Sequence, residues 1–306
     1  MGILGKAVDS VLRQTGNFNV RIIVTDDLSP VPATTELAGR IRDNLGRIVI
    51  IERPNGGPAA ARNNGFDHVA PGTDHVAFLD SDDEWIPEHI ANAMVAMRAG
   101  FDFYFSDHYQ LNQTVSAFKR ACRIDVARHP QVEKAQHVRT YTGNMFNQIL
   151  TGNIIGTSTF VYRFANYPAL RFREEFVYAG EDYLFWLELS KLTSKIAFSD
   201  LCECIYEEGV NIFAGSGWGT EKSLDRLHHE IKYKKALPRL FRLDEVQLNA
   251  NQKNIKVLRK SFVADLVHRL RNRLPIRAQL LANQLKVDPQ TFFQFIPLTI
   301  AKAAKR

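Results

Sequence analysis

Apolar residues recur along the chain at two different spacings, and the first two thirds of the sequence alternate between them. The opening stretch places Leu4, Val8 and Val11 on one helical stripe, which predicts a helix. Two short β-branched runs, residues 20–24 and 48–51, end at polar residues and indicate buried strands. The chain therefore begins with a helix that is followed by strands.

The alternation continues beyond the second strand. Residues 34–45, 59–69 and 87–99 have helical character, whereas residues 75–79 and 101–105 are typical of strands. Strands that alternate with helices predict an α/β fold with a doubly wound, mainly parallel sheet. In such a sheet, ligands bind outside the carboxyl ends of the strands.

The second half of the chain is less regular at first and then helical. Residues 107–150 show no clear period, residues 182–192 form a predicted helix, and the glycines of residues 211–219 predict a loop. We therefore expect two parts, a ligand-binding α/β domain at residues 1–221 and a mainly helical region at residues 222–306.

Charge divides the chain at the same place. The net charge is +6, but residues 1–221 hold 20 Lys and Arg against 27 Asp and Glu, while residues 222–306 hold 19 against 6. Such a basic region has two possible explanations. It is either a helical surface exposed to solvent or a surface that contacts an anionic membrane. The apolar residues near its end favour the membrane: Phe292, Phe293, Phe295, Ile296 and Leu298. No nucleic-acid-binding motif accompanies the charge.

Cysteine usage and hydropathy bear on the compartment. The three cysteines, Cys122, Cys202 and Cys204, form neither a disulfide framework nor a zinc-binding spacing. No apolar stretch approaches the roughly 18 residues of a spanning helix, and no secretion signal opens the chain. We expect a cytoplasmic protein, peripheral at the inner face of the plasma membrane if the basic region binds lipid.

Acidic residues gather at the predicted strand ends. Asp27 follows the first strand, Asn55 follows the second, and three carboxylates within four residues follow the third, at Asp80, Asp82 and Asp83. An acidic turn that caps the next helix explains this cluster in structural terms. However, so many carboxylates repel one another, and a hard divalent cation such as Mg²⁺ or Mn²⁺ offsets that repulsion. The cluster predicts a metal and diphosphate site.

Four motifs in order carry a family resemblance: VTDDLSP, RPNGGPAAARNNG, FLDSDDEWIPEH and GEDYLFWLEL. Together they resemble the family 2 glycosyltransferases of GT-A fold over about residues 3–215, most closely bacterial exopolysaccharide enzymes such as succinoglycan glucosyltransferases. The resemblance implies transfer of a hexose from a UDP-sugar to a saccharide or lipid-linked acceptor with inversion at the sugar, and dependence on Mg²⁺ or Mn²⁺.

The resemblance also implies roles for single residues. Asp27 binds the uracil base, Arg62 supports the nucleotide, Asp80 lies near the ribose, and Asp82 holds the metal with Asp80, while Asp83 orients its neighbours. Each role has a plainer alternative, because Asp27 suits a turn and Arg62 suits a surface ion pair.

The remaining candidates lie later in the chain. The resemblance makes Asp182 the general base, with Glu181 second, although an acid at a helix start is also a common cap. The polar segment of residues 153–159, which begins with Asn153, is expected to contact the donor sugar and the acceptor or to form a plain strand edge. Trp218, between glycines, is expected to cover the donor or to pack in a core. His228 and His229 are expected at the surface, with a place in the metal shell as the alternative for one of them.

One departure from the family pattern stands out. The family begins with a strand ahead of the helix that here starts at residue 3, and we expect the natural start to lie further upstream. Without that strand, its neighbours expose unpaired backbone and apolar surface, which lowers solubility and nucleotide affinity.

Two other classes of function stay open. A non-catalytic nucleotide-sugar-binding or assembly protein fits the missing strand, and it predicts binding without turnover. A nucleotidyltransferase also uses an acidic metal site, but no glycine-rich loop followed by lysine is present to hold a triphosphate. A dinucleotide dehydrogenase is excluded because GGPAAARNNG lacks the required glycine spacing.

Overall fold

The computed structural model describes residues 2–110, 113–132, 135–206 and 217–294. The chain divides into two compact units, the first made of Met1–Val177 with Asp182–Val210 and the second of Tyr178–Glu181 with Asn211–Arg306. The functional boundary that the sequence predicts after residue 221 stays a prediction.

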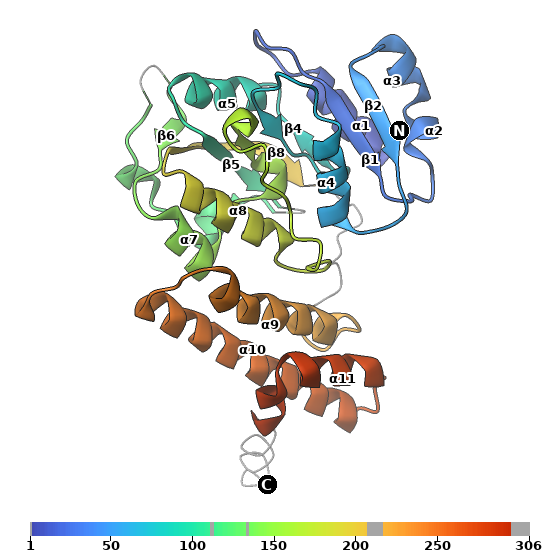
Figure 1. Ribbon diagram of the computed structural model, residues 1–306, viewed down its shortest axis with the longest axis vertical. Helices are drawn as coiled ribbons and strands as arrows, with labels where there is room; N and C mark the ends of the chain where they lie inside the picture. The colour runs from blue at the N-terminus through green and yellow to red at the C-terminus, as the bar shows by residue number, and fades with distance from the viewer. Residues whose placement is uncertain (1, 111–112, 133–134, 207–216, 295–306) are drawn as a thin grey trace. The chain divides into compact units, whose positions relative to one another are not determined.

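The first unit begins with a small helix-and-strand layer (Figure 1). Its elements are α1 (Ile3–Leu12), β1 (Ile22–Asp26), α2 (Ala33–Glu36), α3 (Ala38–Asp43), β2 (Ile48–Glu52) and α4 (Pro58–Asp67). β1 and β2 pair in parallel. Val8 of α1 packs against Leu37 and Ile48, and all three are buried. The predicted helix at residues 34–45 is interrupted at Leu37, where the backbone leaves helical geometry.

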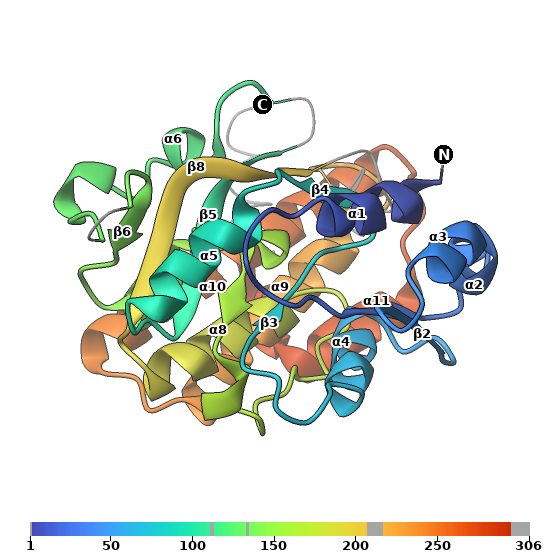
Figure 2. The same cartoon turned by 90° about the horizontal axis from the view of Figure 1, so that it is seen from above.

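A six-stranded sheet forms the centre of the first unit. Its strands are β3 (Val76–Ala77), β4 (Asp83–Trp85), β5 (Phe103–Tyr109), β6 (Val138–Thr140), β7 (Val161–Tyr162) and β8 (Ile196–Tyr206). The accompanying helices are α5 (His89–Arg98), α6 (Ala117–Ala121), α7 (Met145–Gly152) and α8 (Glu181–Leu192). The strand order is β3-β7-β5-β8-β4, with β6 also paired to β8. Figure 2 shows α5 lying along the long strand β8 and its neighbour β5.

The expected α/β architecture is confirmed, but the pairing is mixed. The two longest ladders, β1 with β2 and β5 with β8, are parallel as predicted. The four short ladders, β3–β7, β5–β7, β4–β8 and β6–β8, are antiparallel. The parallel prediction assumed that every helix carries the chain across to a parallel strand, but β4 follows β3 with no helix between them, and β6 and β7 pair antiparallel although α6 and α7 precede them.

Among the described residues, the two sheets do not join. β1 and β3 each end one sheet, and no strand pairs with their outer edges. The expectation that the family's first strand lies upstream of residue 3 stays a prediction.

Aromatic side chains fill the core between the sheet and α8. Phe185 of α8 stacks on Phe172 with ring centroids 4.2 Å apart, and Phe103 meets Phe160 edge to face at 4.8 Å. Phe103, Phe160 and Phe185 are at most 1% exposed. This packing holds α8 against the sheet. It thereby also fixes the position of Asp182, the second residue of the helix.

Within its described residues, the second unit contains three α-helices, α9 (Ser223–Leu240), α10 (Glu245–Arg271) and α11 (Ala278–Val287), followed by the 3-10 helix η4 (Pro289–Gln294). Leu227, Ile231 and Phe262 belong to its core. The predicted surface position of His228 is wrong, because its side chain is 4% exposed and its Nδ1 lies 2.7 Å from Gln284 Oε1. Phe292 packs on the core and Phe293 is exposed, whereas Phe295, Ile296 and Leu298 lie outside the described residues.

A buried carboxylate ties α9, α10 and α11 together. Asp288 follows α11 and is 0% exposed. Its oxygens accept hydrogen bonds from Arg259 of α10 (both 2.6 Å), from Lys235 of α9 (2.9 Å) and from Thr291 (2.7 Å). Burial alone raises the pKa of Asp288, but these donors outweigh it and lower the pKa to about 2.

We predict that Asp288→Asn lowers the free energy of unfolding of the helical unit by about 2 kcal/mol at pH 7. The folded pKa of Asp288 lies below its ordinary value of 3.8, so this stabilisation is complete above pH 4 and disappears as the pH falls toward 2. Urea unfolding at pH 6 and pH 3 measures the difference between the variant and the original protein. The exposed Asp43→Asn is the control, and a difference independent of pH would contradict the prediction.

Candidate active site

A single serine holds the acidic turn between β3 and β4. The N–H of Asp80 donates to Ser158 Oγ at 3.0 Å, and the Ser158 hydroxyl donates to the carboxylate of Asp83. The indole Nε1–H of Trp85 donates to the carbonyl oxygen of Ser158 at 2.5 Å. Ser158 is 0% exposed. Its hydroxyl and carbonyl thus fix both ends of the turn.

The three carboxylates of this turn have different surroundings. Asp83 is 4% exposed and accepts a hydrogen bond from Ser158, and its predicted role of orienting its neighbours stays a prediction. Asp82 is half-buried, and its pKa is raised by burial and then by the negative charge of Asp80. A positive charge near Asp80 and Asp82 would relieve that repulsion.

Arg62 supplies one such charge from the middle of α4. Its Nη2 lies 2.8 Å from Asp80 Oδ1, and its guanidinium lies 5.2 Å from the centre of the Phe172 ring. The Arg62 side chain is 15% exposed, whereas that of Asp80 is 43% exposed. The surface ion pair considered from sequence is therefore a half-buried pair at the acidic turn.

Asp182 belongs to the same electrostatic group. Burial raises the pKa of Asp182, the charge of Arg62 lowers it, and the charge of Asp80 raises it. One carboxylate oxygen of Asp182 also accepts the N–H of Tyr183 at 2.7 Å. The structure thus brings together Asp182, Arg62 and Asp80, three candidates that are far apart in sequence.

Glu181 is the first residue of α8 and directly precedes Asp182. The residue before it, Gly180, has a φ of 96°, and a Cβ built there would lie 2.6 Å from the Tyr233 ring. Only glycine fits this backbone without strain. The backbone conformation therefore explains the glycine of the Gly-Glu-Asp motif, independently of any role of the two acids.

Asp27 directly follows β1 and has three hydrogen-bond donors. Its carboxylate accepts the N–H groups of Gly56 (3.0 and 3.1 Å to its two oxygens) and Gly57 (2.7 Å), and it is paired with Arg53. A carboxylate has about four acceptor positions. The three donors therefore occupy most of them and leave about one for contact with a base.

Asn153 has a local role in the structure. Its side chain accepts the N–H of Ile155 at 3.2 Å and donates to the carbonyl oxygen of the same residue at 2.7 Å. Asn153 ends α7, and its own carbonyl oxygen accepts a hydrogen bond from Arg123. These contacts make it a turn residue, and a sugar contact stays a prediction.

Trp218 belongs to the second unit and is 59% exposed. Its ring centre lies 4.6 Å from that of His268 in α10. The core position considered for Trp218 is wrong, while its predicted contact with a donor sugar is untested. Most of the predicted loop, residues 211–216, lies outside the described residues.

Sequence reasoning missed several residues around these groups. Ser158 lies in the segment noted for polar side chains, but nothing in the sequence showed that it would reach the turn at Asp80. Tyr206 and His108 stack with ring centres 4.5 Å apart, and burial lowers the pKa of His108 to about 4. A Cβ at Gly156 would lie 2.2 Å from the Tyr206 hydroxyl, so glycine is required there.

The described residues contain no group of three or more His, Cys, Asp or Glu side chains placed to share a metal ion. The acidic turn offers two half-buried carboxylates, Asp80 and Asp82. Mg²⁺ in particular is commonly held by one or two carboxylates together with phosphate oxygens of a substrate. This donor set fits such an ion only when a diphosphate supplies further ligands.

Comparison with solved structures identifies the fold. The chain is similar to TarS 1-349 of S. aureus, whose crystal structure contains UDP-GlcNAc, with a TM-score of 0.55 and 17% sequence identity. The match covers 94% of this chain and 76% of that chain. This likeness shows the GT-A fold, an α/β sheet followed here by C-terminal helices.

Sequence comparison gives the family. The model of glycosyl transferase family 2 matches residues 2–167, and the chain belongs to this family. It is similar to the succinoglycan biosynthesis protein ExoW of Rhizobium meliloti (strain 1021), with 27% identity over 99% of this chain and 95% of that protein. A shorter match, 33% identical over 35% of this chain and 40% of the relative, is to WfaP of Escherichia coli, a UDP-Glc:alpha-D-GlcNAc-diphosphoundecaprenol beta-1,3-glucosyltransferase.

The family assignment places the chain among the glycosyltransferases. Within the residues that the structure describes, no helix has the length and apolar character needed to cross a membrane.

We predict that Ser158→Ala lowers the free energy of unfolding by about 1.5–3 kcal/mol, because a buried hydrogen bond to a carboxylate is lost. Ser106→Ala is the matched control, since Ser106 is also 0% exposed but its hydroxyl has no hydrogen-bond partner. We expect the control to change stability by less than about 0.5 kcal/mol. Denaturant unfolding followed by tryptophan fluorescence measures both, and equal losses would contradict the role of Ser158.

Proposed function

We propose that the protein is an inverting glycosyltransferase that moves a hexose, glucose in the first instance, from a UDP-sugar to a lipid-linked or oligosaccharide acceptor. The observation that carries this proposal is the electrostatic group of Asp182, Arg62 and Asp80 in a chain of glycosyl transferase family 2. Two relatives support the pathway and the donor, ExoW through succinoglycan biosynthesis and WfaP through UDP-Glc.

Asp182 is proposed as the general base. Burial raises the pKa of Asp182, which makes the carboxylate a stronger base near neutral pH. In the transfer, the acceptor oxygen forms a bond to the sugar carbon as the bond to the diphosphate breaks, and Asp182 takes the hydroxyl proton. Arg62 keeps Asp182 charged between turnovers, because its positive charge opposes the effect of burial.

Glu181 is the second candidate for this role because it directly precedes Asp182 at the start of α8. The electrostatic coupling to Arg62 and Asp80 favours Asp182 over its neighbour. Substituting each acid separately distinguishes the two.

Asp82 and Asp80 are proposed to hold Mg²⁺ or Mn²⁺ together with the diphosphate of the donor. Their carboxylate oxygens are ligands that these ions accept, and the raised pKa of Asp82 reflects burial and repulsion from Asp80. When bound, the ion stabilises negative charge on the departing nucleotide. Asp83 and Ser158 position the turn, and Asp27, Asn153 and Trp218 are proposed contacts of the nucleotide sugar.

The acceptor places the protein at a membrane surface in this proposal. WfaP is named for a diphosphoundecaprenol acceptor, which is a lipid. The basic residues 222–306 would then contact anionic headgroups at the cytoplasmic face. α10 presents Lys253, Lys256 and Lys260 to solvent, at spacings that put them on one side of the helix.

A second candidate function is nucleotide-sugar binding without turnover. The three donors on Asp27 favour it, because Arg53 and the glycine backbone occupy most of the carboxylate that the predicted contact with the base would use. Incubation with UDP-glucose, Mn²⁺ and a lipid extract separates the two candidates. Release of UDP supports transfer, whereas binding without release supports the second function.

We predict that Asp182→Asn lowers kcat about 10²–10⁴-fold and leaves the affinity for UDP unchanged, because only proton removal is lost. UDP release measures turnover and calorimetry measures UDP binding. Asp43→Asn, exposed in α3, is the control for loss of one negative charge. Full turnover by Asp182→Asn, or a loss in Glu181→Gln instead, would remove the assignment.

We predict that Asp82→Asn lowers metal-dependent transfer about 10²–10³-fold. It should also abolish the increase in UDP affinity that Mn²⁺ produces, while UDP binding without metal stays the same. Titration of UDP with and without Mn²⁺ measures both effects. If Asp82→Asn keeps the Mn²⁺ effect on UDP affinity, then Asp82 does not hold the metal.

A further inference from the structure

The carboxyl ends of β1 and β2 place a carboxylate and a guanidinium side by side. The two strands pair in parallel, and Asp26 lies opposite Glu52 at the last position of the ladder. Asp27 directly follows β1 and Arg53 directly follows β2, so the register of the strands brings both residues to the same edge. The N–H of Arg53 donates to Asp26 O at 2.9 Å, and Arg53 Nη1 lies 2.5 Å from Asp27 Oδ1. Strand register therefore sets this ion pair.

The turn that follows Arg53 directs two backbone donors at the same carboxylate. The N–H of Gly56 reaches both oxygens of Asp27, at 3.0 and 3.1 Å, and the N–H of Gly57 donates to Oδ2 at 2.7 Å. Gly57 has a φ of 84°, and a Cβ built there would lie 2.9 Å from Val177 Cγ1. Only glycine fits this backbone without strain. The shape of the turn therefore keeps both N–H groups on Asp27.

Asp27 retains little capacity for a ligand. A carboxylate has about four acceptor positions. Arg53 uses one on Oδ1, Gly57 uses one on Oδ2, and Gly56 shares its N–H between the two oxygens. The side chain of Asp27 is 18% exposed, and Leu28 and Asn55 beside it in sequence and in space are exposed. A ligand that arrives from solvent therefore finds about one acceptor position on Asp27.

Arg53 has donors to spare beside that position. A guanidinium carries five N–H groups in a fixed planar fork. In the part of the chain that the structure describes, Nη1 is the one guanidinium nitrogen of Arg53 with a hydrogen-bond partner, which is Asp27. The Arg53 side chain is 22% exposed. The pair thus offers a ligand one acceptor with donors next to it.

This arrangement matches one nucleobase edge better than the others. Uracil presents a single N–H between two carbonyl oxygens, so its N–H fits Asp27 while a neighbouring oxygen fits Arg53. Guanine presents two adjacent N–H groups, and a carboxylate accepts both only if it has two free positions. Cytosine has no hydrogen on the corresponding ring nitrogen, so its lone pair would face the carboxylate. A polar group that loses water without gaining a partner weakens binding, and guanine and cytosine each bring one.

We propose that Arg53 is a specificity-determining residue, which restricts Asp27 to a base with a single N–H and so favours uracil over guanine. The proposal rests on the proposed function, in which Asp27 contacts the nucleotide of the donor. Arg53 occupies the acceptor position that the second N–H of guanine needs, and its free N–H groups bind the carbonyl oxygen of uracil. Neither effect involves the diphosphate, which UDP and GDP share.

The test compares the affinities of the full chain and of Arg53→Met for UDP and GDP by calorimetry with Mn²⁺ present. Methionine keeps an unbranched apolar stem and removes every donor. We expect the affinity for UDP to fall and that for GDP to rise, so that their ratio falls at least about 10-fold. Both affinities are measured on one variant, so a loss of folded protein lowers them equally and cancels in the ratio.

Arg42→Met is the matched control. Arg42 lies in α3, its side chain is 78% exposed, and it pairs with Asp43. We expect this variant to keep the ratio of the original protein. If Arg53→Met lowers the affinities for UDP and GDP equally, then Arg53 attracts the diphosphate and the proposal is overturned. An unchanged ratio in Arg53→Met would overturn it as well.

Two further measurements separate this proposal from the proposed function. CDP should bind the original protein at least about 10-fold more weakly than UDP, and equal binding would contradict any contact between Asp27 and the base, which overturns the role of Arg53 too. UDP release from UDP-glucose tests transfer by itself. A fall in the UDP to GDP ratio without UDP release supports the role of Arg53 and contradicts the transferase. UDP release with an unchanged ratio does the reverse.

Discussion

The site depends on how one turn separates three carboxylates. Asp80, Asp82 and Asp83 lie within four consecutive positions, and their mutual repulsion would destabilise a turn that lacked hydrogen-bond donors or positive charges nearby. Ser158 binds Asp83 and the backbone of Asp80, and Arg62 pairs with the Asp80 carboxylate. Asp82 is left with burial and the charge of Asp80, which raise its pKa. The unfavourable electrostatic energy of the turn is therefore concentrated on Asp82, where a bound cation would stabilise the turn most.

The same ion pair connects the turn to α8. Arg62 pairs with Asp80, and its charge also acts on Asp182, so a single guanidinium connects the two sides of the proposed reaction. A dication near Asp80 would compete with Arg62 for that carboxylate. Arg62 would then act more strongly on Asp182 and favour its charged form, which is the form that accepts a proton. Donor binding and the charge of Asp182 would in this way be coupled through one side chain.

The sequence predicted the strands and helices that carry strong periodicity, and it did less well where tertiary contacts decide. The helices α1, α5 and α8 were predicted from their apolar residues, and α4 was predicted because glycines and Pro58 mark its start. β8 was missed because Ile196–Tyr206 mixes acids and cysteines among its apolar residues. Asp80, Asp182 and Arg62 were singled out through motifs. Ser158 was only part of a polar segment, since its partner lies 75 residues away.

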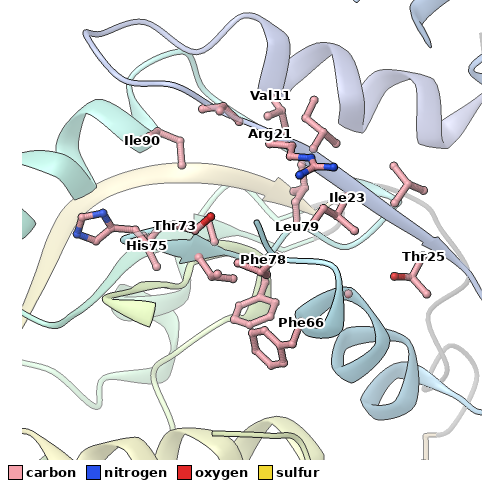
Figure 3. Close-up of a pocket in the computed structure, with 18 of the residues that line it drawn as sticks. Val11, Arg21, Ile23, Thr25, Phe66, Thr73, His75, Phe78, Leu79 and Ile90 are labelled. Carbon is pink, nitrogen blue, oxygen red and sulfur yellow. The ribbon is translucent and has the colours of Figure 1, made fainter. Parts of the chain in front are cut away.

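A cavity of about 920 Å³ lies between β1 and β3 (Figure 3), and its volume is a poor guide to function in this protein. The two acids of the proposed site whose pKa is raised, Asp82 and Asp182, do not line it. Of the proposed site, Arg62 and Asp80 alone reach its lining. The proposed donor chemistry therefore depends on the acidic turn and the start of α8, where charges act on one another, rather than on this apolar hollow.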